Sequence, residues 1–292
     1  MNTKFALIAI SCVAILSATM TPAQSFPIVA RGHSSVQDAS SHPQLEKKID
    51  EARRLISSGK FDAATSLLKE ALVENPKDAI AWNLLGNCYF QLDKFEESIN
   101  AYSKALEIDP KSAVINENMA HVHYWAGHDA ESMKFLDQAL ALDKSRDFSW
   151  FLKGLLLRES DKLSDAIQAF QTAETLSPND IDYKYELGLA LVMADRPDEA
   201  ATKFKQVIAL DAKFSLAHNM LGLIAWSKEA LAEAEGHFRA AINADEKVGA
   251  FHANLAGALL RQGKKDEATA AAKKAKELGL KEHWSFAELG LK

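Results

Sequence analysis

The residue types best suited to chemistry in this chain are three closely spaced histidines, His121, His123 and His128. Imidazole nitrogens bind transition metals and exchange protons near neutral pH. His121 and His123 lie two residues apart in a stretch with helical periodicity, so their side chains point about 200° apart and cannot share one ligand site. His128 follows a glycine where that helix is expected to end. The spacing therefore favours packed or solvated histidines, and we expect no metal site and no cofactor.

The sequence carries no other signature of catalysis. It has no glycine-rich phosphate loop, no paired CxxC motif, no HExxH motif and no nucleophile elbow. Its formal net charge is −6 with both signs interspersed, which provides no basic surface for nucleic acid. We therefore predict that the protein is not an enzyme and does not bind nucleic acid. An enzyme or a metal carrier that uses the histidines is a rival interpretation.

The elements that would position any site recur every 34 residues. Residues 79–112 contain two successive helical patterns, and Pro110 ends the second because proline cannot continue a helix. The residues that share one face in each of the two patterns are Trp82, Leu85, Gly86, Tyr89, Ser98, Tyr102 and Ala105. This arrangement predicts two helices that pack against each other through small residues.

Seven copies of this plan follow one another without an insertion. The eighth residue of each copy is Gly or Ala and the twentieth is always small, which lets paired helices approach to about 8–10 Å. The twenty-fourth residue is bulky in six copies and fills the space that the small residues leave. In the last copy it is Ala272, so we expect the second helix there to pack loosely. The copies span residues 45–78, 79–112, 113–146, 147–180, 181–214, 215–248 and 249–282.

The pattern W-x2-L-G-x2-Y, followed by a small residue, an aromatic residue, alanine and proline at a 34-residue period, resembles the tetratricopeptide repeat (TPR) family. The resemblance implies an all-α fold, a right-handed α-solenoid (superhelix) of about seven helix-turn-helix repeats. Residues 283–292 carry Trp284, Phe286 and Leu289. We expect them to form a C-terminal capping helix over the last exposed face, with an exposed partner-binding tail as the alternative.

Residues 1–23 have the pattern of a secretory signal peptide. A positive charge precedes an apolar run from Phe5 to Met20, and small residues then predict cleavage after Ala23. An uncleaved N-terminal anchor is the alternative, although a permanent membrane helix needs about 20 apolar residues. Residues 24–44 lack a sustained period and are expected to be a flexible linker. We therefore expect a periplasmic or secreted protein.

The resemblance also implies a binding surface. Residues two, five, nine, twelve and thirteen of each first helix lie away from its stacking face, and in the TPR family that side lines the concave groove where peptides bind. We expect this groove to be lined by Asn83, Asn87, Phe90, His121, Tyr124, Trp125, Phe151, Leu155, Arg158, Tyr185, Leu189, Asn219 and Trp226. Contiguous exposed apolar surface of this kind marks a partner site. The alternative is that individual side chains pack between neighbouring repeats.

A groove of this composition favours a hydrophobic or amphipathic segment of another protein. Arg158 is its only central cation, which argues against a clamp for the C-terminal carboxylate of a partner. We predict a non-catalytic protein–protein interaction scaffold in the cell envelope, with support for the assembly of an envelope complex as one role. The alternative is a self-assembling structural protein. Contact with a membrane is expected only if the leader is uncleaved.

Overall fold

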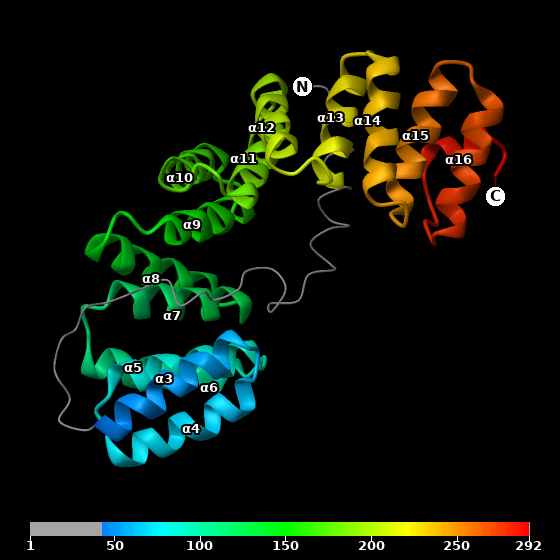
Figure 1. Cartoon of the computed structure of the whole chain (residues 1–292). Coiled ribbons are helices and arrows are strands. Elements are labelled where there is room, and N and C mark those ends of the chain that lie inside the picture. Colours follow the sequence, from blue (N-terminus) through cyan, green and yellow to red (C-terminus); the bar gives the residue numbers. More distant parts are fainter. Residues whose placement is uncertain (1–42, 292) are drawn as a thin grey trace. The chain divides into compact units, whose positions relative to one another are not determined.

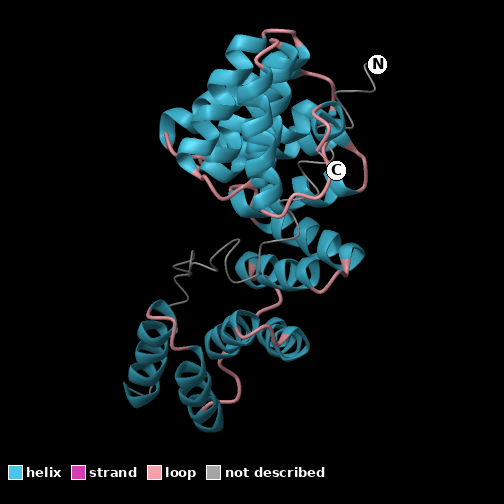
Figure 2. Cartoon of the chain, turned by 90° about the vertical axis from the view of Figure 1, so that its right-hand side faces the viewer, coloured by secondary structure: helices cyan, strands magenta, loops and turns pink. Residues whose placement is uncertain are grey.

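The structure is a computed structural model that describes residues 43–291, and every regular element in that range is a helix (Figure 1 and Figure 2). The predicted signal peptide, residues 1–23, and residues 24–42 of the predicted linker lie outside the described residues. None of the helices in the described range is long and apolar enough to cross a membrane. The chain divides within α9 (Asp147–Glu159) into two compact units, residues 43–156 and 157–291.

Residues 43–156 form a stack in which successive helices from α3 to α8 pack against each other along the chain. These helices, coloured from blue to green in Figure 1, are α3 (Pro43–Ser57), α4 (Phe61–Glu74), α5 (Ala79–Gln91), α6 (Phe95–Ile108), α7 (Ala113–Trp125), α8 (Asp129–Leu142) and the first part of α9. The two helices of a repeat form a pair, and first helices of successive pairs also touch, as α5 and α7 do.

Residues 157–291 repeat the same arrangement. The helices after α9 are α10 (Leu163–Leu176), α11 (Ile181–Met193), α12 (Pro197–Leu210), α13 (Ser215–Ser227), α14 (Leu231–Ala244), α15 (Gly249–Arg261), α16 (Lys265–Glu277) and α17 (Trp284–Glu288). The predicted all-α solenoid of helix-turn-helix repeats with a C-terminal capping helix is thus confirmed.

Each pair turns at the fifteenth residue of its repeat, which has a left-handed backbone. The φ angles at these positions range from 57° to 78°. Glycine adopts this conformation without steric cost, and aspartate tolerates it better than most residues. The seven turn residues are Gly59, Asp93, Gly127, Asp161, Asp195, Glu229 and Gly263. Glu229 is the least suited of them, because its longer side chain gains no local compensation for the strain.

In several repeats the side chain of the fourth residue contacts the loop that precedes its helix. A ring nitrogen of this side chain lies within hydrogen-bond distance of the backbone carbonyl oxygen of the residue six positions earlier. The pairs are Trp82 with Pro76 (2.9 Å), Trp150 with Lys144 (3.0 Å), His218 with Ala212 (3.2 Å) and His252 with Glu246 (2.9 Å). Because a carbonyl can only accept, Nε2 of both histidines carries the proton. These two histidines therefore take the structural place of tryptophan.

The interior of a helix pair is filled by side chains matched in size. A β-carbon on Gly222 would lie 2.5 Å from Cε1 of Phe238, and one on Gly188 would lie 2.6 Å from Cε1 of Phe204. The aromatic ring thus occupies the space of the missing side chain. Where the eighth residue is alanine, the residue sixteen positions later is not aromatic, as in the couples Ala52 and Leu68, Ala120 and Leu136, and Ala256 and Ala272.

The last helix pair, α15 and α16, lacks an aromatic residue at the twenty-fourth position and is completed by α17. Phe286 of α17 is 4% exposed and lies in one apolar cluster with Ala253, Ala256, Ala272 and Ala275. Ala270 and Ala271 of α16 also line a pocket together with residues of α14 and α15. At the start of α17, Trp284 packs against Trp226 of α13, with ring centroids 5.6 Å apart.

Candidate peptide-binding surface

The thirteen predicted groove residues divide into a buried and a partly exposed set. Eight of them are buried, namely Asn87, Phe90, His121, Phe151, Leu155, Tyr185, Leu189 and Asn219. Five are partly exposed, namely Asn83, Tyr124, Trp125, Arg158 and Trp226. For the buried set, packing between helices is the role that the structure shows, which is the alternative that the sequence left open. Only the second set can touch a partner directly without rearrangement.

Three of the buried and partly buried rings form a continuous run across successive repeats of residues 43–156. The ring of His121 on α7 lies 4.7 Å from that of Phe90 on α5 and 5.0 Å from that of Phe148 on α9. Trp125 donates a hydrogen bond of 3.0 Å from Nε1 to Nε2 of His121. Burial lowers the pKa of His121 to about 3, so the ring is neutral and accepts this bond. The imidazole therefore behaves as one more aromatic ring of the run.

The exposed edge of this run is made by Tyr124 and Trp125, which follow each other at the end of α7. Their rings meet edge to face with centroids 5.8 Å apart, and both are partly exposed, as is Phe148. We call the five residues Phe90, His121, Tyr124, Trp125 and Phe148 the aromatic row. Its buried members fix the position of the exposed ones, which is the condition for a rigid aromatic contact surface.

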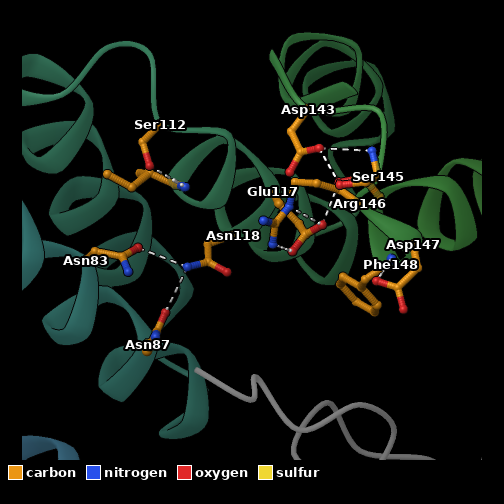
Figure 3. Close-up of polar contacts among 12 residues, drawn as sticks. Asn83, Asn87, Ser112, Glu117, Asn118, Asp143, Ser145, Arg146, Asp147 and Phe148 are labelled. Carbon is orange, nitrogen blue, oxygen red and sulfur yellow. Dashed lines mark hydrogen bonds and ion pairs between the residues drawn. The ribbon is translucent and has the colours of Figure 1, made fainter. Parts of the chain in front are cut away.

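Polar side chains beside the aromatic row are engaged with one another (Figure 3). Asn118 donates from Nδ2 to Oδ1 of Asn83 at 2.9 Å and to Oδ1 of Asn87 at 3.3 Å. The carboxylate of Glu117 accepts from Arg146, whose Nε lies 2.9 Å away, and from the hydroxyl of Ser149 at 2.6 Å. Glu117 is 6% exposed, so its charge is balanced inside the protein rather than by water.

The predicted groove residues of residues 157–291 are also engaged. Arg158 forms an ion pair with Glu186, and only 13% of its side chain is exposed. Asn219 accepts a 2.9 Å hydrogen bond from Nδ2 of Asn254. Arg158, the only central cation expected in the groove, is thus paired with a carboxylate of α11.

The asparagine contacts were missed from the sequence, although a signal exists. Asn83 and Asn118 are 35 residues apart, and so are Asn219 and Asn254. In both cases the fifth residue of one repeat meets the sixth residue of the next. Two asparagines that lie 35 residues apart, one residue more than the repeat period, thus indicate a contact between the first helices of neighbouring repeats.

Within residues 43–291, no group of three or more histidine, cysteine, aspartate or glutamate side chains could hold a metal ion. Cys88 is buried, and burial raises the pKa of its thiol to about 11, which keeps it protonated and unreactive.

Two family models described as tetratricopeptide repeat match the chain at residues 49–113 and 185–249 and at residues 149–180. Together they cover more than half of it. The chain belongs to the tetratricopeptide repeat family. TPR proteins in general are modules for binding other proteins or peptides, and the arrangement of side chains described above agrees with that role.

Curated relatives match this chain over part of their own length. The cytochrome c-type biogenesis protein CycH of Rhizobium meliloti is 30% identical over 135 residues, 44% of this chain and 35% of that protein. The formate-dependent nitrite reductase complex subunit NrfG of Escherichia coli O157:H7 is 25% identical over 126 residues, 42% of this chain and 61% of that protein. Against the curated relatives compared, the match spans between 15% and 61% of the relative's length.

The fold is shared with solved TPR structures. The C-terminal part of a TPR repeat-containing protein from Cytophaga hutchinsonii superposes with a TM-score of 0.66 at 16% identity, covering 82% of this chain and 99% of that one. A likeness at this identity shows the architecture and leaves the partner to be argued from the side chains of this chain.

Proposed function

We propose that this TPR protein is a non-catalytic scaffold that binds a segment of another protein through the aromatic row. The observation that carries the proposal is the pair Tyr124 and Trp125, partly exposed and held in place by the buried rings behind them. Exposed tryptophan and tyrosine on a rigid support are the side chains that most often carry binding energy in protein interfaces. An apolar side chain of a bound peptide segment can pack against such exposed rings.

The chemistry of the row favours a segment with apolar side chains over one with a terminal carboxylate. A carboxylate clamp needs cations that are free to pair with it. Arg146 is bound to Glu117 and Arg158 to Glu186, each largely buried. An incoming carboxylate could pair with either arginine only by displacing the glutamate that it already binds. That buried glutamate would lose its counter-charge, which costs about 3–5 kcal/mol in typical cases. A hydrophobic or amphipathic segment avoids that cost.

We further propose that the protein acts outside the cytoplasmic membrane. The support is the signal-peptide pattern of residues 1–23 in the sequence. The names of two relatives, a subunit of a reductase complex and a cytochrome biogenesis protein, agree with a role in assembling other proteins. Fractionation of the native cells, with detection of the mature N-terminus by mass spectrometry, would test both the location and the cleavage after Ala23.

The binding proposal is tested by cross-linked pulldown from the native envelope with the wild type and a Tyr124→Ala, Trp125→Ala double variant. The matched control is Leu142→Ala, which removes a 45% exposed apolar side chain at the end of α8, outside the aromatic row. We expect a partner that is captured by the wild type and the control and lost by the double variant, with folding verified by circular dichroism. Equal capture by all three would refute the row as the site. Recovery of the protein's own copies alone would favour self-assembly instead.

A further inference from the structure

The turn between α7 and α8 brings two histidines together that the aromatic row does not use. His123 is the eleventh residue of α7 and is 8% exposed, whereas His128 is exposed and immediately precedes α8. Their Nδ1 atoms lie 3.3 Å apart, and the backbone N–H of His128 donates to the carbonyl of His123 at 2.8 Å. The left-handed turn at Gly127 produces this meeting, because it reverses the chain between the two rings.

The separation of the two Nδ1 atoms fits a metal ion between them. Histidine nitrogens bind zinc at about 2.0–2.1 Å, and two such bonds at the tetrahedral angle place the nitrogens about 3.3–3.4 Å apart. The observed 3.3 Å agrees with that spacing. It is at the long end for a hydrogen bond, since N–H donors lie most often about 2.9–3.0 Å from their acceptors. The distance between the two nitrogens therefore suits the chelation of one ion.

The more buried ligand is held in its orientation. The ring of His123 stacks on that of Phe135 of α8, with centroids 5.5 Å apart and planes 8° from parallel. This stacking fixes the plane of the imidazole of His123 and therefore the direction in which its Nδ1 points.

We propose that His123 and His128 form a two-histidine site for a divalent transition metal, with water completing the coordination on the exposed side of His128. The site binds Cu(II) more tightly than Zn(II), as the general affinity order of imidazole ligands requires. With only two protein ligands and an open side, it suits reversible uptake of metal rather than a permanent structural ion. This inference is independent of the proposed binding through the aromatic row.

A second histidine pair supplies an internal control. The rings of His218 and His237 lie 6.3 Å apart between centroids, but Nε2 of His218 is committed to the carbonyl of Ala212 and Nε2 of His237 lies 3.8 Å from Glu233. Both pairs thus place two imidazoles near each other. Only His123 and His128 turn ring nitrogens toward each other at a chelating distance.

The test uses the full chain without an affinity tag, stripped of metal with a chelator. Cu(II) and Zn(II) are titrated by calorimetry into the wild type, His128→Ala and the matched control His237→Ala. We expect one site per chain in the wild type and in the control. Changes to groups that only hydrogen-bond a metal ligand cost about 10–100-fold in affinity, so the loss of a ligand in His128→Ala should weaken binding by at least about tenfold.

Electron paramagnetic resonance of the Cu(II) complex adds a readout that stability alone does not change. The wild type should show coupling to two imidazole nitrogens, and His128→Ala should lose it. His128→Ala is expected to fold, because the side chain is exposed and makes no capping hydrogen bond to α8. Equal affinity of the wild type and His128→Ala, equal weakening by His237→Ala, or absence of binding by either metal would each overturn the proposal.

Discussion

Inside the helix pair α13–α14, a phenyl ring of Phe238 fills the space beside Gly222, so that contact is purely one of shape. At the junctions between repeats of residues 43–156, by contrast, Asn118 reaches Asn83 and Arg146 reaches Glu117 through hydrogen bonds. The same fit of a ring beside a glycine occurs in several repeats, so it does not distinguish one repeat from another. A polar couple forms only where both partners are present, so it is particular to one junction. We therefore expect that emptying a pair interior lowers the stability more than breaking a polar couple at a junction, and that the polar couples help to select which repeat follows which.

The largest expected effect comes from emptying a pair interior. Phe204→Ala removes a fully buried ring beside Gly188 and should lower the free energy of unfolding by about 3–5 kcal/mol. Denaturant titration measures it. Leu210→Ala on the same helix is the control, since that side chain is 43% exposed and its loss should cost little. Similar losses for both variants would contradict the shape-based account of the pair interior.

A junction is broken by Glu117→Gln. The change removes the charge that Arg146 and Ser149 share inside the protein, and hydrogen bonds to charged groups contribute about 1.5–3 kcal/mol. We expect a loss in that range on denaturation. Asp137→Asn serves as the comparison, because its ion pair with Lys153 is 58% exposed on the aspartate side and should contribute below about 1 kcal/mol. An unchanged free energy of unfolding for Glu117→Gln would mean that the junction does not need the buried charge.

The size match within a pair predicts a compensating double variant. Gly222→Ala alone should destabilise by about 1–3 kcal/mol, because its β-carbon meets the ring of Phe238. Adding Phe238→Leu recreates the alanine and leucine couple that Ala120 and Leu136 form in the third repeat. A double-mutant cycle should then show a favourable coupling of about 0.5–3 kcal/mol. If the effects of the two single changes on the free energy of unfolding simply add, the side-chain volumes at the two positions do not compensate for each other.

Acid should affect the junction more than the pair interior. The pKa of His121 is lowered by burial from 6.5 to about 3, so between these values the unfolded chain binds a proton that the folded chain does not. The contribution of His121 to stability is therefore complete above about pH 6.5 and is lost as the pH falls toward 3. His121→Phe keeps an aromatic ring and removes this pH-dependent contribution to stability. We expect its stability to fall less than that of the wild type on acidification, measured by thermal melts at several pH values.

The smallest effect should be a gain. Glu229 has a φ of 60°, a left-handed conformation that glycine adopts freely. Glu229→Gly should stabilise the protein by about 1 kcal/mol, since the strain of a left-handed residue is of that order. Asp195→Gly, at the same position of the preceding repeat, should gain less because aspartate tolerates this region better. A melting temperature lowered by Glu229→Gly would show that its side chain has a role that outweighs the strain.

The sequence predicts the fold well because the features that determine it are periodic. The small residue at the eighth position of all seven repeats is required by the packing of two helices within one repeat. A proline such as Pro110 likewise ends a helix within its own repeat. The exposure of a groove residue depends instead on what the neighbouring repeat places over it. Phe90 and Phe151 lie on the predicted groove side and are nevertheless fully buried. The meeting of His123 and His128 was equally out of reach, because it depends on the turn at Gly127 rather than on helical spacing.

The contact of Phe286 with α15 and α16 also has a consequence for how the array can change in length. The first helix of a repeat packs on the helix pair before it. Here α17 takes that place, and its Phe286 lies in one cluster with four buried alanines of α15 and α16, against which Leu280, Leu289 and Leu291 also pack. An added repeat inserted after α16 would have to present small residues to Phe286 in the same way, whereas one inserted between earlier pairs would meet surfaces that already accept a neighbour. Lengthening this protein by duplication should therefore succeed in the interior of the array and fail at α17.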